Sequence, residues 1–155
     1  MPFVELSPFE AAGALLTGMV PAELGTVKQY SHRYGIKVWF DSEKAPREHY
    51  EAQVLGAKDV PAAKVLAIEV GFHAEYSKEA ENEAVLTKLL ATEKQWRKEV
   101  GKEAEMAPFF GRAHHWRRVS EAWLDPDLGD PELAFEIAAR LTDYISAIEP
   151  RRRSG

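Results

Sequence analysis

The segment KVLAIEVGFHAEY, residues 64–76, decides the fold of this 155-residue chain. A period of two is typical of a β-strand with one face on an apolar core. We therefore expect a strand here, with branched and aromatic groups directed toward helices and ionisable groups on the reverse side. The apolar side of this strand carries Leu66, Ile68, Val70 and Phe72, and the reverse side carries Ala67, Glu69, Gly71 and His73.

Two segments upstream show the same period. Residues 26–40 predict one strand, with a bulge or bend at Gly35. Residues 49–55 alternate again, and residues 116–123 alternate less regularly and predict a fourth strand. Short connections join the first three strands, which favours an antiparallel meander. The expected apolar face of the first strand carries Tyr30, His32, Tyr34, Ile36, Val38 and Phe40.

Three segments carry helix signals. Ser7-Pro8-Phe9-Glu10 is a capping box with proline at the first helical position, and it begins a short helix that stops before Pro21. Residues 77–100 predict a long helix with Ser77 as its N-cap. A third helix is expected from residue 130 to Pro150.

Together these elements predict an α+β fold in the order α-β-β-β-α-β-α. Each helix has one apolar stripe and the meander has one apolar face, so the expected architecture is a two-layer sandwich. Its antiparallel sheet has three to four strands, with the helices packed on one face. Residues 1–150 form a single domain in this prediction, and residues 151–155 form a solvated basic tail.

Composition excludes several classes of protein. The chain has no cysteine, which rules out disulfide scaffolds, cysteine zinc sites and thiol nucleophiles. Its apolar runs fall far short of the roughly 20 residues that cross a bilayer, and its N-terminus lacks the pattern of a secretory signal. The net charge of -5 argues against binding to the nucleic-acid backbone. We expect a bacterial, cytoplasmic protein without membrane or nucleic-acid partners.

The polar sides of the second and third predicted strands hold the candidate chemistry. His49 and Glu51 share one side, as do Glu69 and His73, and an antiparallel register would bring the two pairs together. Two carboxylates with neutral imidazoles form a reasonable shell for a divalent metal ion, and they also suit acid–base chemistry. The alternative is the solvated face that antiparallel sheets commonly have, in which case no cofactor is expected.

A second candidate site surrounds Trp39. It falls on the polar side of its predicted strand, beside Lys37 and Arg33. An exposed aromatic framed by basic groups is typical of an anchor for a partner protein or an anionic ligand. These three residues are therefore the binding candidates.

The second half of the chain resembles uncharacterised bacterial proteins and is similar to domains found beside restriction nucleases. Residues 64–150 carry the resemblance, through the strand 65–75, Glu99-Val100-Gly101, Trp116-Arg117-Arg118-Val119 and Glu149-Pro150. It implies no catalytic residue. The nuclease pattern requires Glu-x-Lys, whereas this chain has Glu69-Val70-Gly71.

Two functions are consistent with these observations. The first is a noncatalytic module that binds a protein or a ligand and forms a homodimer near Trp39. The alternative is a divalent-metal-dependent phosphoester hydrolase, with Glu51 and Glu69 as ligands and His49 or His73 as ligand or base. Phosphate-binding loops and other familiar catalytic motifs are absent from the sequence.

Overall fold

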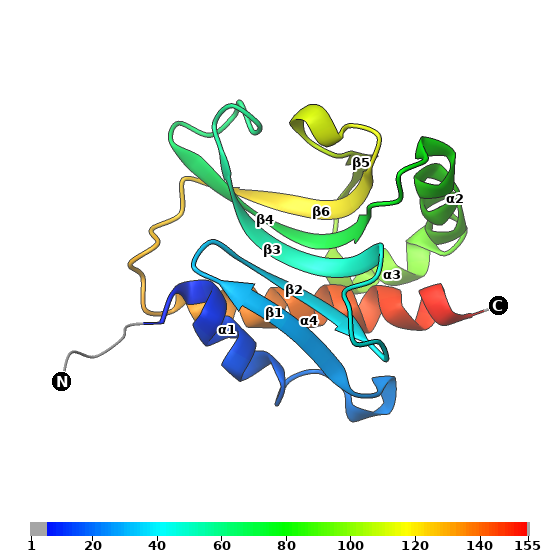
Figure 1. The fold of residues 1–155 in the computed structure, drawn as a ribbon, viewed down its shortest axis with the longest axis horizontal. Coiled ribbons are helices and arrows are strands. Elements are labelled where there is room, and N and C mark those ends of the chain that lie inside the picture. The colour runs from blue at the N-terminus through cyan, green and yellow to red at the C-terminus, as the bar shows by residue number, and fades with distance from the viewer. Residues whose placement is uncertain (1–5, 155) are drawn as a thin grey trace.

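The computed structural model describes residues 6–154 and shows one six-stranded antiparallel sheet with helices packed against it (Figure 1). The strand order across the sheet is β1-β2-β3-β4-β6-β5. This confirms the α+β class with an antiparallel sheet. The elements are α1 (Pro8–Leu16), a 3₁₀ turn (Ala22–Leu24), β1 (Val27–His32), β2 (Gly35–Phe40), β3 (Glu48–Gly56), β4 (Leu66–Ala74), α2 (Glu79–Leu90), α3 (Glu93–Val100), β5 (Glu105–Pro108), a 3₁₀ turn (Gly111–Ala113), β6 (Arg117–Leu124) and α4 (Leu133–Arg153).

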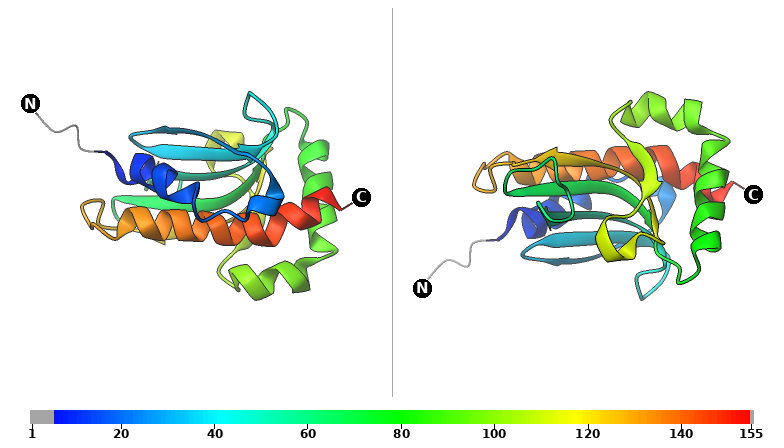
Figure 2. Two further views of the ribbon diagram at one scale, coloured as in Figure 1. Left: turned by 90° about the horizontal axis from the view of Figure 1, so that it is seen from below. Right: turned by 90° about the horizontal axis from the view of Figure 1, so that it is seen from above.

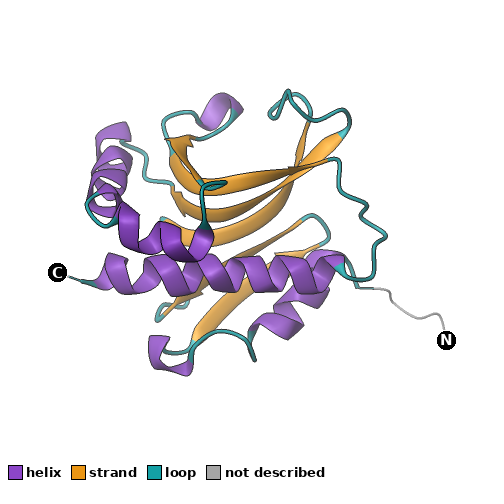
Figure 3. Cartoon of the chain, turned by 180° about the vertical axis from the view of Figure 1, so that it is seen from behind, coloured by secondary structure: helices purple, strands orange, loops and turns teal. Residues whose placement is uncertain are grey.

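The main core lies between the sheet and the helices α1 and α4. Figure 2 shows α4 running along one side of the sheet, and Figure 3, seen from behind, shows it crossing in front of the strands. Because burial of apolar surface is the main favourable contribution to folding, this layer fixes which face of each strand points inward. Fully buried members include Phe9, Tyr50, Ile68, Val70, Phe72, Ile137, Leu141 and Ile145.

The segment that decides the fold is strand β4, near the centre of the sheet. It pairs with β3 on one side and β6 on the other, and its alternation is the expected one. The predicted strand at 49–55 is β3, and the predicted fourth strand is β6. The capping box at Ser7 and Glu10 begins α1 as predicted.

The single strand predicted for residues 26–40 is wrong, because the chain folds back at Arg33 and Tyr34. His32 pairs with Gly35, so β1 and β2 form a tight hairpin. In such a hairpin, even-numbered residues before the turn lie on the opposite face from even-numbered residues after it. Tyr30 therefore faces the same way as Lys37 and is exposed, instead of joining Ile36 in the core.

The sheet has six strands instead of the predicted three to four, because the first predicted strand is the hairpin of β1 and β2 and because β5 was missed. The connector after α3 adds this four-residue edge strand, which pairs with β6. The long helix predicted for residues 77–100 is two helices, α2 and α3, and Lys78 rather than Ser77 occupies the N-cap. The break lets the buried Trp96 indole donate a hydrogen bond to the Leu89 carbonyl at 2.8 Å.

Helix α4 continues through Pro150 to Arg153, so the predicted end at Pro150 is wrong, and the predicted tail is helical as far as Arg153. The carboxylate of Glu149 is 1% exposed and accepts hydrogen bonds from the Tyr50 hydroxyl, Arg152 and Arg153. A buried carboxylate needs such partners. Their attraction compensates for the helical hydrogen bond that proline cannot make. No helix among residues 6–154 is long and apolar enough to cross a membrane.

We expect a truncation after Pro150 to destabilise the fold, because it leaves the buried Glu149 carboxylate without its two arginines. The expected loss in unfolding free energy is at least about 2 kcal/mol, measured by urea denaturation. Removal of Ser154 and Gly155 alone is the matched control and leaves stability unchanged. Equal stability of the two truncations would contradict this role for the arginines.

Candidate metal centre

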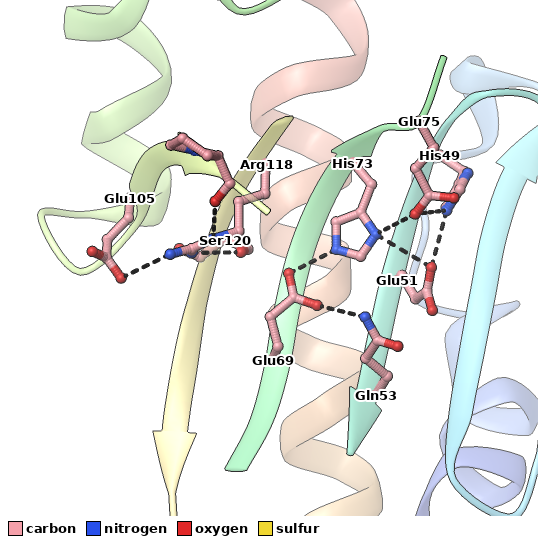
Figure 4. A network of polar contacts seen from close by, with 10 residues as sticks. His49, Glu51, Gln53, Glu69, His73, Glu75, Glu105, Arg118 and Ser120 are labelled. Carbon is pink, nitrogen blue, oxygen red and sulfur yellow. Dashed lines mark hydrogen bonds and ion pairs between the residues drawn. The ribbon is translucent and has the colours of Figure 1, made fainter. Parts of the chain in front are cut away.

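The register of β3 and β4 brings the polar candidates together on the sheet face opposite α4. His49 pairs directly with His73, and Gln53 pairs with Glu69. Glu51 lies opposite Gly71, so it is diagonal to Glu69 and not directly paired with it. Figure 4 shows the resulting network, with the side chain of His73 between Glu69 and Glu51.

This part of the sheet face is covered, so its interpretation as a solvated face is wrong. His73 and Glu69 are 0% exposed, and His49 is 2% exposed. The ring of Phe109 lies against His73, with centroids 4.9 Å apart. A second apolar cluster covers the neighbouring part of the same face and consists of Val60, Ala63 and Ala67 with Leu55, Phe110 and Ala122.

Four side chains present one ligand atom each to a common point, and these atoms all lie within 4.8 Å of one another. The Nε2 atom of His49 is 3.0 Å from Glu51 Oε1 and 3.4 Å from Glu75 Oε2. The Nδ1 atom of His73 is 3.2 Å and 3.1 Å from the same two oxygens. Imidazole nitrogens and carboxylate oxygens therefore alternate around a closed ring.

The size of this ring suits a transition-metal ion. A tetrahedron with metal–ligand bonds of about 2.0 Å has edges of about 3.3 Å, and a square with bonds of about 2.2 Å has edges of about 3.1 Å. The four measured edges, from 3.0 to 3.4 Å, fall in that range. The same distances also allow N–H···O hydrogen bonds when the rings carry protons.

The remaining nitrogen of each imidazole is held by an acceptor outside the ring. Nδ1 of His49 donates to the Pro46 carbonyl at 2.9 Å. Nε2 of His73 donates to Glu69 Oε2 at 2.7 Å, and the Gln53 amide donates to the other Glu69 oxygen at 3.1 Å. Metal-bound histidines in proteins almost always have such a second partner, which fixes the tautomer and the ring orientation.

The ring residues shift one another's pKa values in the absence of a metal ion. Burial lowers the pKa of His73, but the Glu69 charge and hydrogen bonds to Glu51 and Glu75 outweigh it and raise that pKa well above its usual range. The same competition raises the pKa of His49. Burial raises the pKa of Glu51, yet hydrogen bonds to His49 and His73 bring it down to about 2, and the pKa of Glu75 is also lowered. In the metal-free state below pH 6.5, these shifts favour the imidazolium form of both histidines, whose positive charge offsets that of the carboxylates.

Three of the four predicted metal candidates belong to the ring: His49, Glu51 and His73. Glu69 lies outside it, on the far nitrogen of His73, where it orients the imidazole. Glu75 occupies the place expected for Glu69. It shares the parity of Glu69 and His73 within the predicted strand but was not chosen as a ligand, and it lies one residue beyond the end of β4.

The expectation of an exposed Trp39 is wrong. This side chain is 7% exposed, and its indole nitrogen donates to the Ser42 carbonyl at 2.7 Å. Arg33 lies in the hairpin turn, with its guanidinium over the Tyr34 ring. Lys37 lies on the same sheet face as Glu51. Binding of a partner by these three residues stays a prediction, now without the exposed aromatic anchor.

Comparisons of the chain with protein-family models, curated proteins and solved structures found no match. The resemblance of residues 64–150 to domains found beside restriction nucleases therefore stays a prediction. The candidate site is defined by its geometry alone.

The metal-free protein should lose stability as the pH rises above neutrality. A histidine whose folded pKa exceeds its usual 6.5 stabilises the fold fully below pH 6.5, and this contribution is lost as the pH rises through the folded value. The Glu51 carboxylate stabilises the fold above its usual pKa of 4.5, and this stabilisation is lost as the pH falls toward its folded pKa of about 2. The cluster therefore contributes most between pH 4.5 and 6.5.

Urea denaturation in EDTA between pH 6 and 9 measures this effect. The free energy of unfolding should fall by up to about 1.4 kcal/mol per pH unit for each titrating histidine. His49→Gln should reduce the fall, whereas His114→Gln, at an exposed position outside the cluster, should keep it. The same pH profile in both variants would contradict the charge assignment.

Proposed function

We propose that this protein binds one divalent transition-metal ion between β3 and β4. Its ligands are His49 Nε2, Glu51 Oε1, His73 Nδ1 and Glu75 Oε2. The observation that carries the proposal is the convergence of these four atoms, with the other nitrogen of each imidazole held by Pro46 or Glu69.

The ligand set selects the class of ion. Imidazole suits Zn²⁺, Fe²⁺, Ni²⁺ and Cu²⁺, whereas Mg²⁺ and Ca²⁺ prefer shells of oxygen alone. Two neutral imidazoles with two carboxylates therefore favour a transition-metal ion. The absence of cysteine excludes the thiolate sites that many structural zinc domains use.

Charge balance supports the same proposal. Three carboxylates lie around the two imidazoles: Glu51 and Glu75 in the ring, and Glu69 on the outer nitrogen of His73. Their side chains are at most 12% exposed. Like charges this close are tolerated only with compensating positive charge. Two protons on the imidazoles supply it in the absence of metal, and one divalent ion supplies the same charge in their place.

Of the two functions inferred from the sequence, only the hydrolase would use the proposed ion. Metal-dependent phosphoester hydrolysis stays a prediction that the proposed ion would serve as a Lewis acid. The homodimeric interaction module also stays a prediction, and the burial of Trp39 removes the feature on which it rested.

Calorimetric titration with Zn²⁺ and Mn²⁺ tests the proposal directly. We expect one ion per chain, and we expect Glu51→Gln or Glu75→Gln to weaken binding by at least about 100-fold, because each removes a charged ligand. Glu81→Gln, on the exposed side of α2, is the matched control and should bind as the wild type. Absence of binding heat at millimolar metal would overturn the proposal.

Loss of the outer partner should weaken binding without removing a ligand. Glu69→Gln deprives the His73 ring of its charged acceptor, and the expected loss in metal affinity is about 10- to 100-fold. Unaltered affinity in this variant would show that Glu69 does not orient the ring.

Metal binding should also release protons. At pH 6 both imidazoles of the folded, metal-free protein carry their extra proton, so Zn²⁺ should displace about two protons per ion. Titrations in buffers with different ionisation enthalpies measure this number. Release of no protons would contradict binding through both histidines.

A further inference from the structure

Lys37 lies directly across the sheet from a proposed metal ligand. It pairs with Glu51 in the register of β2 and β3. Directly paired residues point to the same face of a sheet, and the neighbours Ile36 and Val38 are buried on the other face. The side chain of Lys37 therefore lies on the face that carries the four-residue ring.

The ammonium group of Lys37 has no protein partner among residues 6–154, where none of the ion pairs or side-chain hydrogen bonds involves it. The adjacent carboxylate oxygen, Glu51 Oε1, already faces Nε2 of His49 and Nδ1 of His73. Lys37, which is half-buried and lies opposite Glu51 in the register, is thus left without a close ion pair. The Lys37 ammonium group can therefore pair with an anion that is not part of the chain.

The ring opens to solvent on its carboxylate side. The side chains of Glu51 and Glu75 are 11% and 12% exposed, whereas those of His49 and His73 are 2% and 0% exposed. Lys37 is the cross-strand neighbour of Glu51, one of the two exposed ligands, and lies on the same face of the sheet. An ion with four protein ligands and octahedral preference has two further positions, which must be filled by groups that enter from solvent.

The buried charges leave room for an anion there. A divalent ion and the guanidinium of Arg118, which lies opposite His73 and is 5% exposed, together balance Glu51, Glu69 and Glu75. The carboxylate partner of Arg118, Glu105, is 62% exposed and 3.4 Å away, so its charge is largely screened by water. Lys37 then adds a positive charge that the buried groups do not neutralise.

We propose that Lys37 and the metal ion together bind a phosphoryl oxyanion, with one oxygen on the ion and another on the ammonium group. The inference rests on the proposed function, because it requires the ion. It supplies the anionic subsite that a phosphoester hydrolase would need. A free phosphate and a phosphate monoester share this chemistry, and inorganic phosphate is the probe for both.

The test uses the full chain loaded with Mn²⁺, whose unpaired electrons broaden the ³¹P resonance of any phosphate bound to it. Titration of inorganic phosphate should give saturable broadening with the wild type. Lys37→Gln should weaken the apparent phosphate affinity by about tenfold, the effect of losing one charge-assisted contact. Lys94→Gln, an exposed position on α3, makes the same charge change away from the sheet and should behave as the wild type.

Electron paramagnetic resonance of free Mn²⁺ in the same samples separates the possible failures. If the wild type does not bind Mn²⁺, the proposed function itself is wrong. If it binds Mn²⁺ but phosphate is not broadened, or if Lys37→Gln binds phosphate as tightly as the wild type, the oxyanion subsite is wrong and the metal site stands. Thermal unfolding of Lys37→Gln at the wild-type temperature confirms that the variant is folded.

Discussion

The fully buried imidazole of His73, held between Glu69 on one nitrogen and Glu51 and Glu75 on the other, is the contact on which the candidate site depends. Three carboxylates within reach of one ring repel one another strongly where water is excluded. They can share this space only when positive charge lies between them. Protons on the imidazoles or a divalent cation meet that requirement, and the surrounding hydrogen bonds direct both rings toward the same point.

The sheet links this site to the hydrophobic core through the alternation of its strands. Tyr50 lies between His49 and Glu51, points to the opposite face, and donates its hydroxyl hydrogen bond to Glu149 of α4. A shift of β3 by one residue would turn the two ligands toward the apolar core under α4 and turn Tyr50 toward the face that carries the ring. The packing of α4 therefore holds the register that brings the ligands together.

The sequence predicted the parts of this arrangement that depend on periodicity. Alternation in residues 64–76 identified β4 and placed His73 on the face shared with His49 and Glu51. It could not show that residues 57–65 and Phe109 cover this face, because coverage depends on contacts between distant segments. For the same reason Trp39 was expected to be exposed, and a two-residue turn reversed the face of Tyr30 without interrupting the apparent alternation. Glu75 shares the parity of His73 in the predicted strand, but alternation alone could not show that Glu75, rather than Glu69, reaches the ring.

Binding of one ion at the point where the four ligand atoms converge can be observed by anomalous diffraction. Crystals grown with Mn²⁺ or Zn²⁺ would be measured on both sides of the metal absorption edge. We expect one strong peak about 2.0–2.2 Å from His49 Nε2, His73 Nδ1 and a carboxylate oxygen each of Glu51 and Glu75. A map with no peak between β3 and β4, or with a peak bound by Glu69 instead of Glu75, would contradict it.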